Sequence, residues 1–205
     1  MNAPKLSLKR AEWLKSINWI GVIAGILMIA LPFAGPWWRL TIGTEAVDVA
    51  TSPFNVNITA LGQPVESTLV RYVCFGVALT VIIAGLFMLF ASLLPERWWS
   101  KRLIHFGATK VLWMVVFFIV AVTLMALVAN KLLPGMSPEL SGFSMPYISG
   151  STVSTLTMED VTVTMPITAS INSAFILAIV VAILGVGTRI YQRKFLPPKI
   201  AEKRA

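Results

Sequence analysis

The sequence predicts an all-α membrane fold, a four-helix transmembrane bundle that carries a small extracytoplasmic β-sheet built from two outer loops. Three observations lead to this fold class. Of the 205 residues, 57% are hydrophobic and 13% are charged, which is about half the charged share of a soluble domain. Four uncharged stretches each reach the roughly 20 residues that a membrane-crossing helix needs. The two loops expected outside alternate apolar and polar residues, as half-buried strands do.

Charged residues set the limits of each uncharged stretch. The four predicted spans are about 17–38, 72–95, 111–130 and 166–189. The fourth is expected to begin at Pro166, because a proline at the first helical position gives up no hydrogen bond inside the helix. The outer loops are then 39–71 and 131–165, and residues 1–205 form a single membrane domain. The first stretch is longer than the apolar part of a signal peptide, which has about 7–15 residues, so we expect it to be retained.

Lys and Arg lie mostly on one side of the predicted spans. Fourteen of the seventeen occupy the N-terminal segment, the loop 96–110 and the C-terminal tail, against Arg39, Arg71 and Lys131 on the other side. Cytoplasmic loops carry such an excess, so both termini are predicted to be cytoplasmic in a multi-pass protein of the plasma (cell) membrane. Anionic lipids on the cytoplasmic face would pair with these basic segments. They explain the net charge of +8 without a nucleic-acid partner.

Seven tryptophans fall close to the predicted ends of the spans, where aromatic rings anchor helices in the membrane interface. The predicted interfacial anchors are Trp13, Trp19, Trp37, Trp38, Trp98, Trp99 and Trp113. The adjacent pair Trp37 and Trp38 has an alternative use, which is to stack on a quinone or a sugar.

Apolar and polar residues alternate in both outer loops. In the first loop the alternation covers 38–42 and 54–59, and in the second a Thr-rich segment at 152–158 precedes alternation at 161–165. Such segments predict half-buried strands. Because an isolated hairpin is only marginally stable in water, we expect the two loops to pair into one sheet. The alternative is two separate flexible loops.

One N-glycosylation sequon occurs in the chain, Asn57-Ile58-Thr59, and it lies in the first outer loop. Asn57 is therefore a candidate glycosylation site. A three-residue pattern also arises by chance, and its use depends on the organism.

Small residues recur at four-residue spacing in two of the predicted helices, where they let helix backbones approach in lipid. The predicted packing residues are Gly21, Gly25, Ser170, Ala174, Ala178 and Ala182. They fit packing inside the bundle, and equally a face that meets another subunit.

Asp, Glu, Lys, Arg and His are absent from the interior of the predicted spans, with Arg189 only at the last position of the fourth, although transporters and pumps usually carry such residues there. The single cysteine, Cys74, allows no intrachain disulfide, and with the single histidine, His105, it makes no Cys/His metal site within one chain. No motif of a hydrolase, a metalloprotease or a nucleotide-binding protein occurs. We therefore expect no catalytic residues, no metal and no cofactor, although an apolar groove between helices could still hold a lipid or a quinone.

The layout resembles that of claudin/PMP22-type tetraspan membrane proteins. The shared features are four spans, inside termini, a strand-bearing first outer loop that opens with Trp37 and Trp38, and a shorter strand-bearing second loop. The Gly-Leu-Trp sequence and the two loop cysteines of the claudin signature are absent. The sparse cysteine and the polar, uncharged outer loops also resemble those of small four-span membrane proteins of archaea.

These features predict a non-enzymatic structural or accessory membrane protein. It would bind other membrane-protein subunits, or itself as a homo-oligomer, through its outer sheet and its small-residue helix faces. The segments 161–165 and 54–59 are the expected contacts, because an exposed strand edge can add a partner strand. The alternative function is a pore or small-solute carrier built by oligomerisation.

Overall fold

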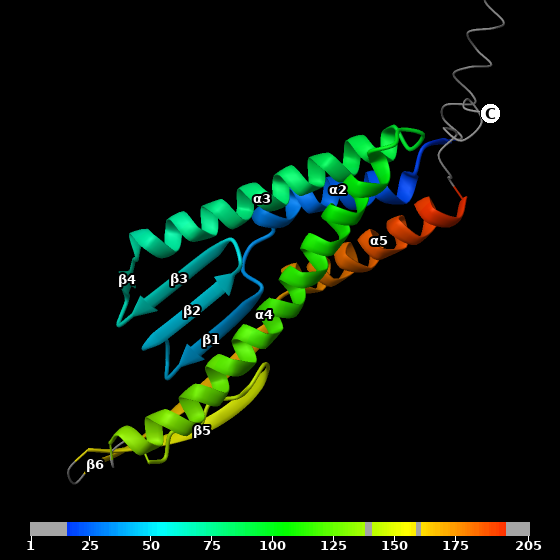
Figure 1. The fold of residues 1–205 in the computed structure, drawn as a ribbon. Helices are drawn as coiled ribbons and strands as arrows, with labels where there is room; N and C mark the ends of the chain where they lie inside the picture. The colour runs from blue at the N-terminus through cyan, green and yellow to red at the C-terminus, as the bar shows by residue number, and fades with distance from the viewer. Residues whose placement is uncertain (1–15, 138–140, 159–160, 196–205) are drawn as a thin grey trace, which may run out of the picture. The chain divides into compact units, whose positions relative to one another are not determined.

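The computed structural model describes residues 16–137, 141–158 and 161–195 (Figure 1). In chain order the elements are α2 (Trp19–Ala30), η1 (Leu31–Phe33), β1 (Trp38–Ile42), β2 (Val47–Ser52), β3 (Asn55–Ala60), β4 (Gln63–Val65), α3 (Thr68–Leu93), α4 (Ser100–Met136), β5 (Gly150–Met158), β6 (Val161–Ile171) and α5 (Ser173–Phe195). The described residues therefore form four α-helices and a six-stranded antiparallel sheet.

The chain divides into two compact units. Unit 1 is Met1–Phe33, Leu79–Trp113 and Ala178–Ala205, and unit 2 is Ala34–Ala78 and Met114–Leu177. Helices α3, α4 and α5 contribute residues to both units, whereas all six strands belong to unit 2. The prediction that 1–205 is a single domain stays a prediction.

Three of the described helices are long and apolar enough to cross a membrane, as expected of a membrane protein. These segments are Thr68–Leu93, Ser100–Met136 and Ser173–Lys194. The remaining apolar helix, Trp19–Phe33, is shorter. The predicted combination of apolar helices with a small sheet is thus confirmed.

The first helix is shorter than the predicted span 17–38. Helix α2 ends at Ala30, one turn of 3₁₀ helix follows, and Trp38 already begins strand β1. Pro36 has no N–H to donate, and Gly35 adopts a φ of 96°, which turns the chain out of the helix. An apolar run cannot by itself separate one long helix from a short helix, a turn and a strand.

Helix α4 is longer than the predicted span 111–130 at both ends. It begins at Ser100 and ends at Met136, with Pro134 in its last turn. The prediction stopped at Lys110 and Lys131 because charges are costly in lipid. A helix can nevertheless continue beyond the lipid, where Lys and Arg side chains reach water.

The fourth predicted span, 166–189, was wrong in its first turns. Pro166 and Ser170 lie in strand β6, which runs to Ile171, and helix α5 begins at Ser173. The Pro166 carbonyl accepts a hydrogen bond from the Gly43 N–H at 2.7 Å, just beyond the last residue of β1. A proline is tolerated there because the paired ladder of β1 and β6 ends at this point.

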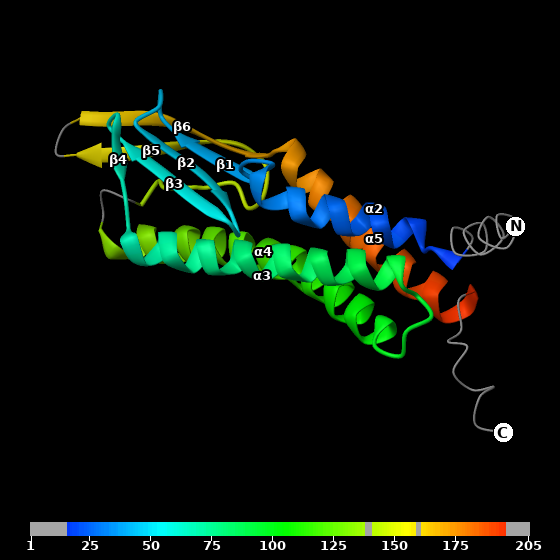
Figure 2. The same cartoon turned by 90° about the horizontal axis from the view of Figure 1, so that it is seen from above.

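The sheet joins the two predicted outer loops, which confirms the expected pairing. Its strand order is β4-β3-β2-β1-β6-β5, so β1 from the first loop pairs with β6 from the second. The register runs from Trp38 opposite Ile171 to Ile42 opposite Ile167. Figure 2 shows β5 and β6 as a hairpin that extends beyond the turn between β1 and β2.

Glycines let the helices of unit 1 approach closely. A Cβ atom on Gly21 would overlap the side chains of Ser92 and Thr188, and one on Gly25 would lie 2.9 Å from the Leu89 nitrogen. These contacts place the Gly21–Gly25 pair where α2 meets α3, with Gly21 also against α5. Close backbone approach of this kind is how small residues pack helices in lipid.

A buried polar network also links the helix ends of unit 1. The Asn18 amide donates to the Thr188 carbonyl at 3.3 Å and to Gln192 Oε1 at 3.2 Å. Gln192 in turn donates to the Pro95 carbonyl and to Ser100 Oγ. The three side chains involved in these bonds, Asn18, Gln192 and Ser100, are buried, and buried polar groups that keep their partners fix one arrangement of the helices around them.

We predict that Gln192→Ala destabilises the protein, because it leaves buried partners of the network without a hydrogen bond. Such a loss costs about 1–3 kcal/mol of unfolding free energy. The neighbouring Arg193→Ala is the control, since Arg193 is exposed. Thermal unfolding of both variants in one detergent checks the prediction. Equal midpoints for the two variants would show that the network does not hold the helices.

Candidate functional site

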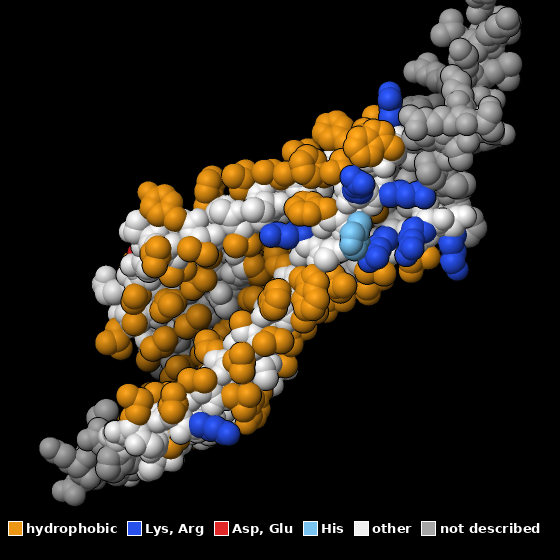
Figure 3. Space-filling view, in the orientation of Figure 1, with side chains coloured by type: hydrophobic (Ala, Val, Ile, Leu, Met, Phe, Trp, Pro, Cys, Tyr) orange, Lys and Arg blue, Asp and Glu red, His pale blue; other side chains and the backbone are white. Residues whose placement is uncertain are grey.

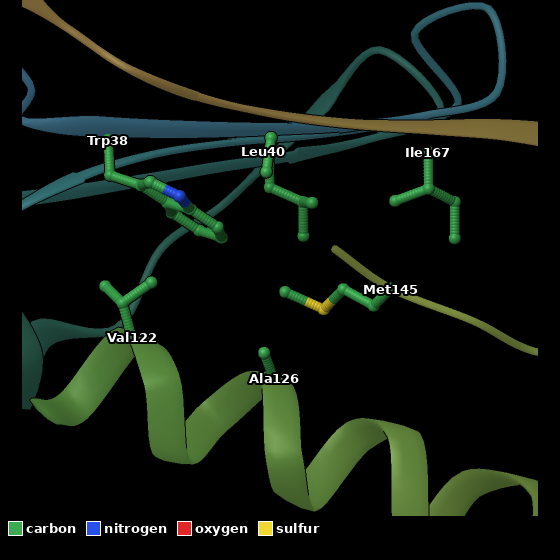
Figure 4. Packing of buried hydrophobic residues seen from close by; sticks show 7 residues of the cluster. Trp38, Leu40, Val122, Ala126, Met145 and Ile167 are labelled. Carbon is green, nitrogen blue, oxygen red and sulfur yellow. The ribbon is translucent and has the colours of Figure 1, made fainter. Parts of the chain in front are cut away.

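One face of the sheet packs on helix α4 and forms the core of unit 2. Strands β1 and β6 supply Trp38, Leu40 and Ile167, and these face Val122 and Ala126 of α4 (Figure 4). Met145, from the segment before β5, fills the space between them. Each large apolar side chain buried here contributes about 1.5–3 kcal/mol to stability. Because this face of the sheet is covered by α4, only the opposite face and the strand edges remain available to a partner.

The segment 143–149 ties α4 to the sheet by main-chain groups. Asn130 of α4 donates to the Met145 carbonyl at 2.8 Å and accepts from the Met145 N–H at 2.7 Å. On the other side, Trp38 Nε1 donates to the Ile148 carbonyl at 2.7 Å. The segment therefore satisfies its polar groups through contacts with a helix on one side and a strand on the other.

Trp37 and Trp38 are buried, so their assignment as interfacial anchors is wrong. Trp37 is 0% exposed and Trp38 is 1% exposed. The ring of Trp37 lies among Phe54, Phe118 and Phe175, with centroid distances of 5.7, 5.1 and 5.6 Å. Stacking on a quinone or a sugar needs an open ring face, which neither indole offers. Core and interface both use aromatic residues, and the sequence alone does not separate the two.

The Trp37 indole N–H has no hydrogen-bond partner among the described residues. Two of its three phenylalanine neighbours, Phe54 and Phe118, meet it edge to face, at interplanar angles of 85° and 74°. An aromatic ring face is a weak acceptor for an N–H group. The unpaired N–H therefore belongs to an indole packed among aromatic rings, and by itself it implies no ligand.

The opposite face of the sheet carries an ion pair. Arg39 on β1 binds Asp48 on β2 through two hydrogen bonds of 2.8 Å, and Thr41 adds a longer one at 3.3 Å. The hydrogen bond from Arg39 holds the pKa of the Asp48 carboxyl below its usual value, and the same contact raises the pKa of Arg39. Because Arg39 is half exposed, the pair contributes little to stability.

Among the described residues, no strand pairs with one edge of β6 over residues 161–165. Its partner β1 pairs only with residues 167–171, whereas β5 pairs with β6 along the opposite edge as far as Val161. The Pro166 carbonyl points to the β1 side, since Gly43 donates to it. By alternation along the strand, Thr162 and Thr164 direct their main-chain N–H and C=O groups to that same open side.

The outer edge of β5, in contrast, is partly covered by the segment that precedes it. The Thr155 N–H donates to the Gly142 carbonyl at 3.3 Å. The side-chain hydroxyls of Thr152 and Ser154 both donate to the Ser144 carbonyl at 2.8 Å. The Thr155 bond uses a main-chain N–H of this edge, and the two hydroxyl bonds hold the covering segment against β5, which makes β6 the better candidate for adding a strand.

A groove opens beside strand β3. Residues 55–58 of β3 form one wall, and the connection 65–68 with residues 70–72 of α3 forms the other. Its volume is about 730 Å³. Strand β4 pairs only with residues 58–60 of β3, so the edge of β3 at 55–57 faces this groove without a paired strand. Asn57, the candidate glycosylation site, has an exposed side chain in the groove.

The other predicted packing residues occupy two different elements. Ala174, Ala178 and Ala182 are buried residues of α5. Ser170 is exposed and belongs to β6, so its assignment to a helix-packing stripe is wrong. The four-residue spacing continued by chance across the junction of strand and helix.

The remaining predicted anchors differ in exposure. Trp19, Trp98 and Trp113 are more than half exposed, Trp99 is partly exposed, and Trp13 lies outside the described residues. Their anchoring role stays a prediction. Arg102 lies over the Trp98 ring, 5.5 Å from its centroid, which is within the range of a cation–π interaction.

Basic side chains gather at one end of the helices of unit 1 (Figure 3). The described Lys and Arg residues of this unit are Arg97, Lys101, Arg102, Lys110, Arg189, Arg193 and Lys194, which we call the basic cluster. Within the described residues of unit 1, Glu96 is the one acid. The cluster therefore carries a strong positive charge.

In the part of the chain that the structure describes, no group of three or more His, Cys, Asp or Glu side chains comes together. Comparison with protein-family models, with curated proteins and with solved structures finds no match for this chain. The candidate site is therefore defined by geometry alone: the open edge of β6, and the groove beside β3.

Neither the polar network of unit 1 nor the groove was predicted from the sequence. The polar network of Asn18 and Gln192 joins residues 174 positions apart, and neither residue belongs to a motif. The groove depends on β4 being only three residues long. Pro64 was the available signal, because a proline interrupts strand pairing and confines it to a sheet edge.

We predict a small pH dependence from the Arg39–Asp48 pair. The folded pKa of Asp48 is lowered, so its stabilisation is present above the unfolded pKa of about 3.9 and is lost as the pH falls through the folded pKa. Melting curves of the wild type and Asp48→Asn between pH 7 and pH 3 check this. The wild type should melt higher at pH 7, and the difference should shrink towards pH 3. A difference that stays constant with pH would contradict the assignment.

Proposed function

We propose that this chain is a non-enzymatic accessory membrane protein that binds another membrane protein, or a second copy of itself, through its six-stranded sheet. The observation that supports this best is the open edge of β6. Residues 161–165 carry no charge and no proline, although natural sheets usually protect free edges with one or the other. An unprotected edge can bind a partner strand through main-chain hydrogen bonds.

Residues 161–165 support strand addition better than 54–59, the other expected contact. Five consecutive residues are open on β6, close to the usual strand length of about five to six. On β3 only three residues, 55–57, lack a strand on that side. The partner strand is therefore assigned to β6.

The proposal includes four membrane crossings, with both termini cytoplasmic in the cell membrane. Its support is the placement of Lys and Arg along the sequence. The fourth crossing would use α2, whose twelve residues cover about 18 Å of the roughly 30 Å hydrocarbon core. Flanking residues and local thinning of the bilayer would make up the rest. The layout resembles that of claudin/PMP22-type tetraspans.

The basic cluster would lie on the cytoplasmic surface in this topology. Seven Lys and Arg residues stand there against one acid in the described part of unit 1. Anionic headgroups attract such clusters by about 1 kcal/mol per basic residue close to the surface. The same topology would leave Asn57 on the opposite side, where a glycan could be added.

The alternative of an oligomeric pore or carrier has weaker support. A pore needs polar side chains free to line it. Thr123 instead donates to the Ile119 carbonyl of its own helix at 2.8 Å, and Asn130 holds Met145. Both groups are used within unit 2.

Two substitutions at one edge position test the proposal. Thr164→Pro removes a main-chain N–H that faces the open side of β6, whereas Thr164→Val keeps it. Since 1.4 kcal/mol is tenfold in affinity and one hydrogen bond is worth about 0.5–1.5 kcal/mol, we predict that Thr164→Pro weakens association by about two- to tenfold. Thr164→Val should associate like the wild type. Quantitative mass spectrometry of complexes purified in mild detergent measures the recovered partner or second copy.

Full recovery of the complex with Thr164→Pro would contradict strand addition at β6. A wild-type protein that is monomeric and without any stoichiometric partner in its native membrane would contradict the accessory function itself. Both variants should keep the wild-type melting temperature, because Thr164 does not direct its N–H toward β5.

A further inference from the structure

The groove beside β3 contains two opposite charges that are not paired with each other or with other described residues. Glu66 and Arg71 both line the groove and both are exposed. Unlike Arg39 and Asp48, neither side chain forms an ion pair with another described residue. A groove with one free carboxylate and one free guanidinium suits a ligand that carries both a negative and a positive group.

Neutral hydrogen-bonding groups surround these charges. Asn57 contributes an exposed amide, and Ser67 and Thr68 contribute hydroxyls where the chain enters α3. The edge of β3 at 55–57 adds main-chain groups that no strand pairs on this side. Tyr72 completes the wall with a phenol ring that is 72% exposed.

The groove also lies at the end of an apolar helix. Helix α3 begins at Thr68 and is long and apolar enough to cross a membrane. Its first turns expose large apolar side chains, with Leu69 at 75%, Val73 at 59% and Phe75 at 67%. A ligand with a polar head and hydrocarbon chains could therefore place its head in the polar groove and its chains on the apolar surface of α3.

We propose that this groove binds the headgroup of a zwitterionic phospholipid of the phosphatidylethanolamine type. Arg71 binds the phosphate, Glu66 binds the ammonium group, and Asn57 and Tyr72 hydrogen-bond the phosphate and glycerol oxygens. The acyl chains lie on the exposed apolar face of α3. The assignment goes beyond the proposed accessory function and does not depend on it, since it needs only α3 as a membrane-crossing helix.

A protein strand fits the groove less well than a lipid. The free edge of β3 is only three residues long, against a usual strand of about five to six. A strand would also leave Glu66 and Arg71 without assigned partners. A zwitterionic headgroup uses both charges.

Titration of the purified protein with lipids, followed by native mass spectrometry, tests the assignment. The ligands are phosphatidylethanolamine, phosphatidylglycerol, which lacks the ammonium group, and glycerophosphoethanolamine, which lacks the acyl chains. The variants are Arg71→Gln and Glu66→Gln, with Lys131→Gln as a control because Lys131 is an exposed cation of the same unit outside the groove.

The wild type should prefer phosphatidylethanolamine over phosphatidylglycerol by about tenfold, because only phosphatidylethanolamine offers an ammonium group to Glu66. Glu66→Gln should abolish that preference while binding of phosphatidylglycerol is kept. Arg71→Gln should weaken both lipids by about tenfold, and Lys131→Gln should match the wild type. Glycerophosphoethanolamine should bind far more weakly than the intact lipid.

Three results would overturn the assignment. The first is equal wild-type affinity for the two lipids, and the second is an Arg71→Gln variant that binds like Lys131→Gln. The third is binding of glycerophosphoethanolamine as tight as that of the lipid, which would identify a soluble ligand. A photo-crosslinker at Asn57 gives an independent check. Capture of a protein segment in place of lipid would assign the groove to strand addition instead.

Discussion

The pairing of β1 with β6 is the interaction on which unit 2 depends. It joins segments more than a hundred residues apart in the sequence, from Trp38 opposite Ile171 to Ile42 opposite Ile167. The Asn172 N–H extends the ladder to the Trp37 carbonyl at 2.9 Å, directly before α5 begins. Without this pairing, the first loop would be a meander and the second an isolated hairpin, which is marginal in water. With it, one sheet presents a continuous apolar face to α4.

Hydrogen bonds from amide side chains also support the packing in each unit separately. In unit 2, Asn130 binds both main-chain groups of Met145. In unit 1, Asn18 and Gln192 hold helix ends together. An unsatisfied polar group is more costly in lipid than in water, because no solvent can replace its partner. These bonds are therefore the part of the packing that specifies one arrangement, while the apolar contacts supply most of the stabilisation.

The sequence was sufficient to predict apolar helices, strands in both loops and the joining of the loops, because hydrophobic length and period-two alternation report directly on lipid and on sheet faces. The sequence was not sufficient to predict where one element ends and the next begins, or whether an aromatic residue lies in the core or at the membrane interface. Pro166 fits a helix start and a strand end equally well, and Trp37 fits an interface as well as an aromatic core. The groove depends on the length of β4, and the open edge of β6 depends on how far β1 extends. Both are outcomes of register, which no local pattern encodes.

The most direct test of the central pairing is a disulfide across it. In a Cys74→Ser background, cysteines replace Thr41 and Thr168, which are opposite each other in the register. Antiparallel partners lie about 4.5–5.5 Å apart at Cα, within the range that a disulfide bridges. The structure predicts rapid oxidation of this pair, and slow or no oxidation when Thr41 is combined with Ser170, two residues out of register. No bond between 41 and 168, or equal oxidation of both pairs, would contradict the joined sheet.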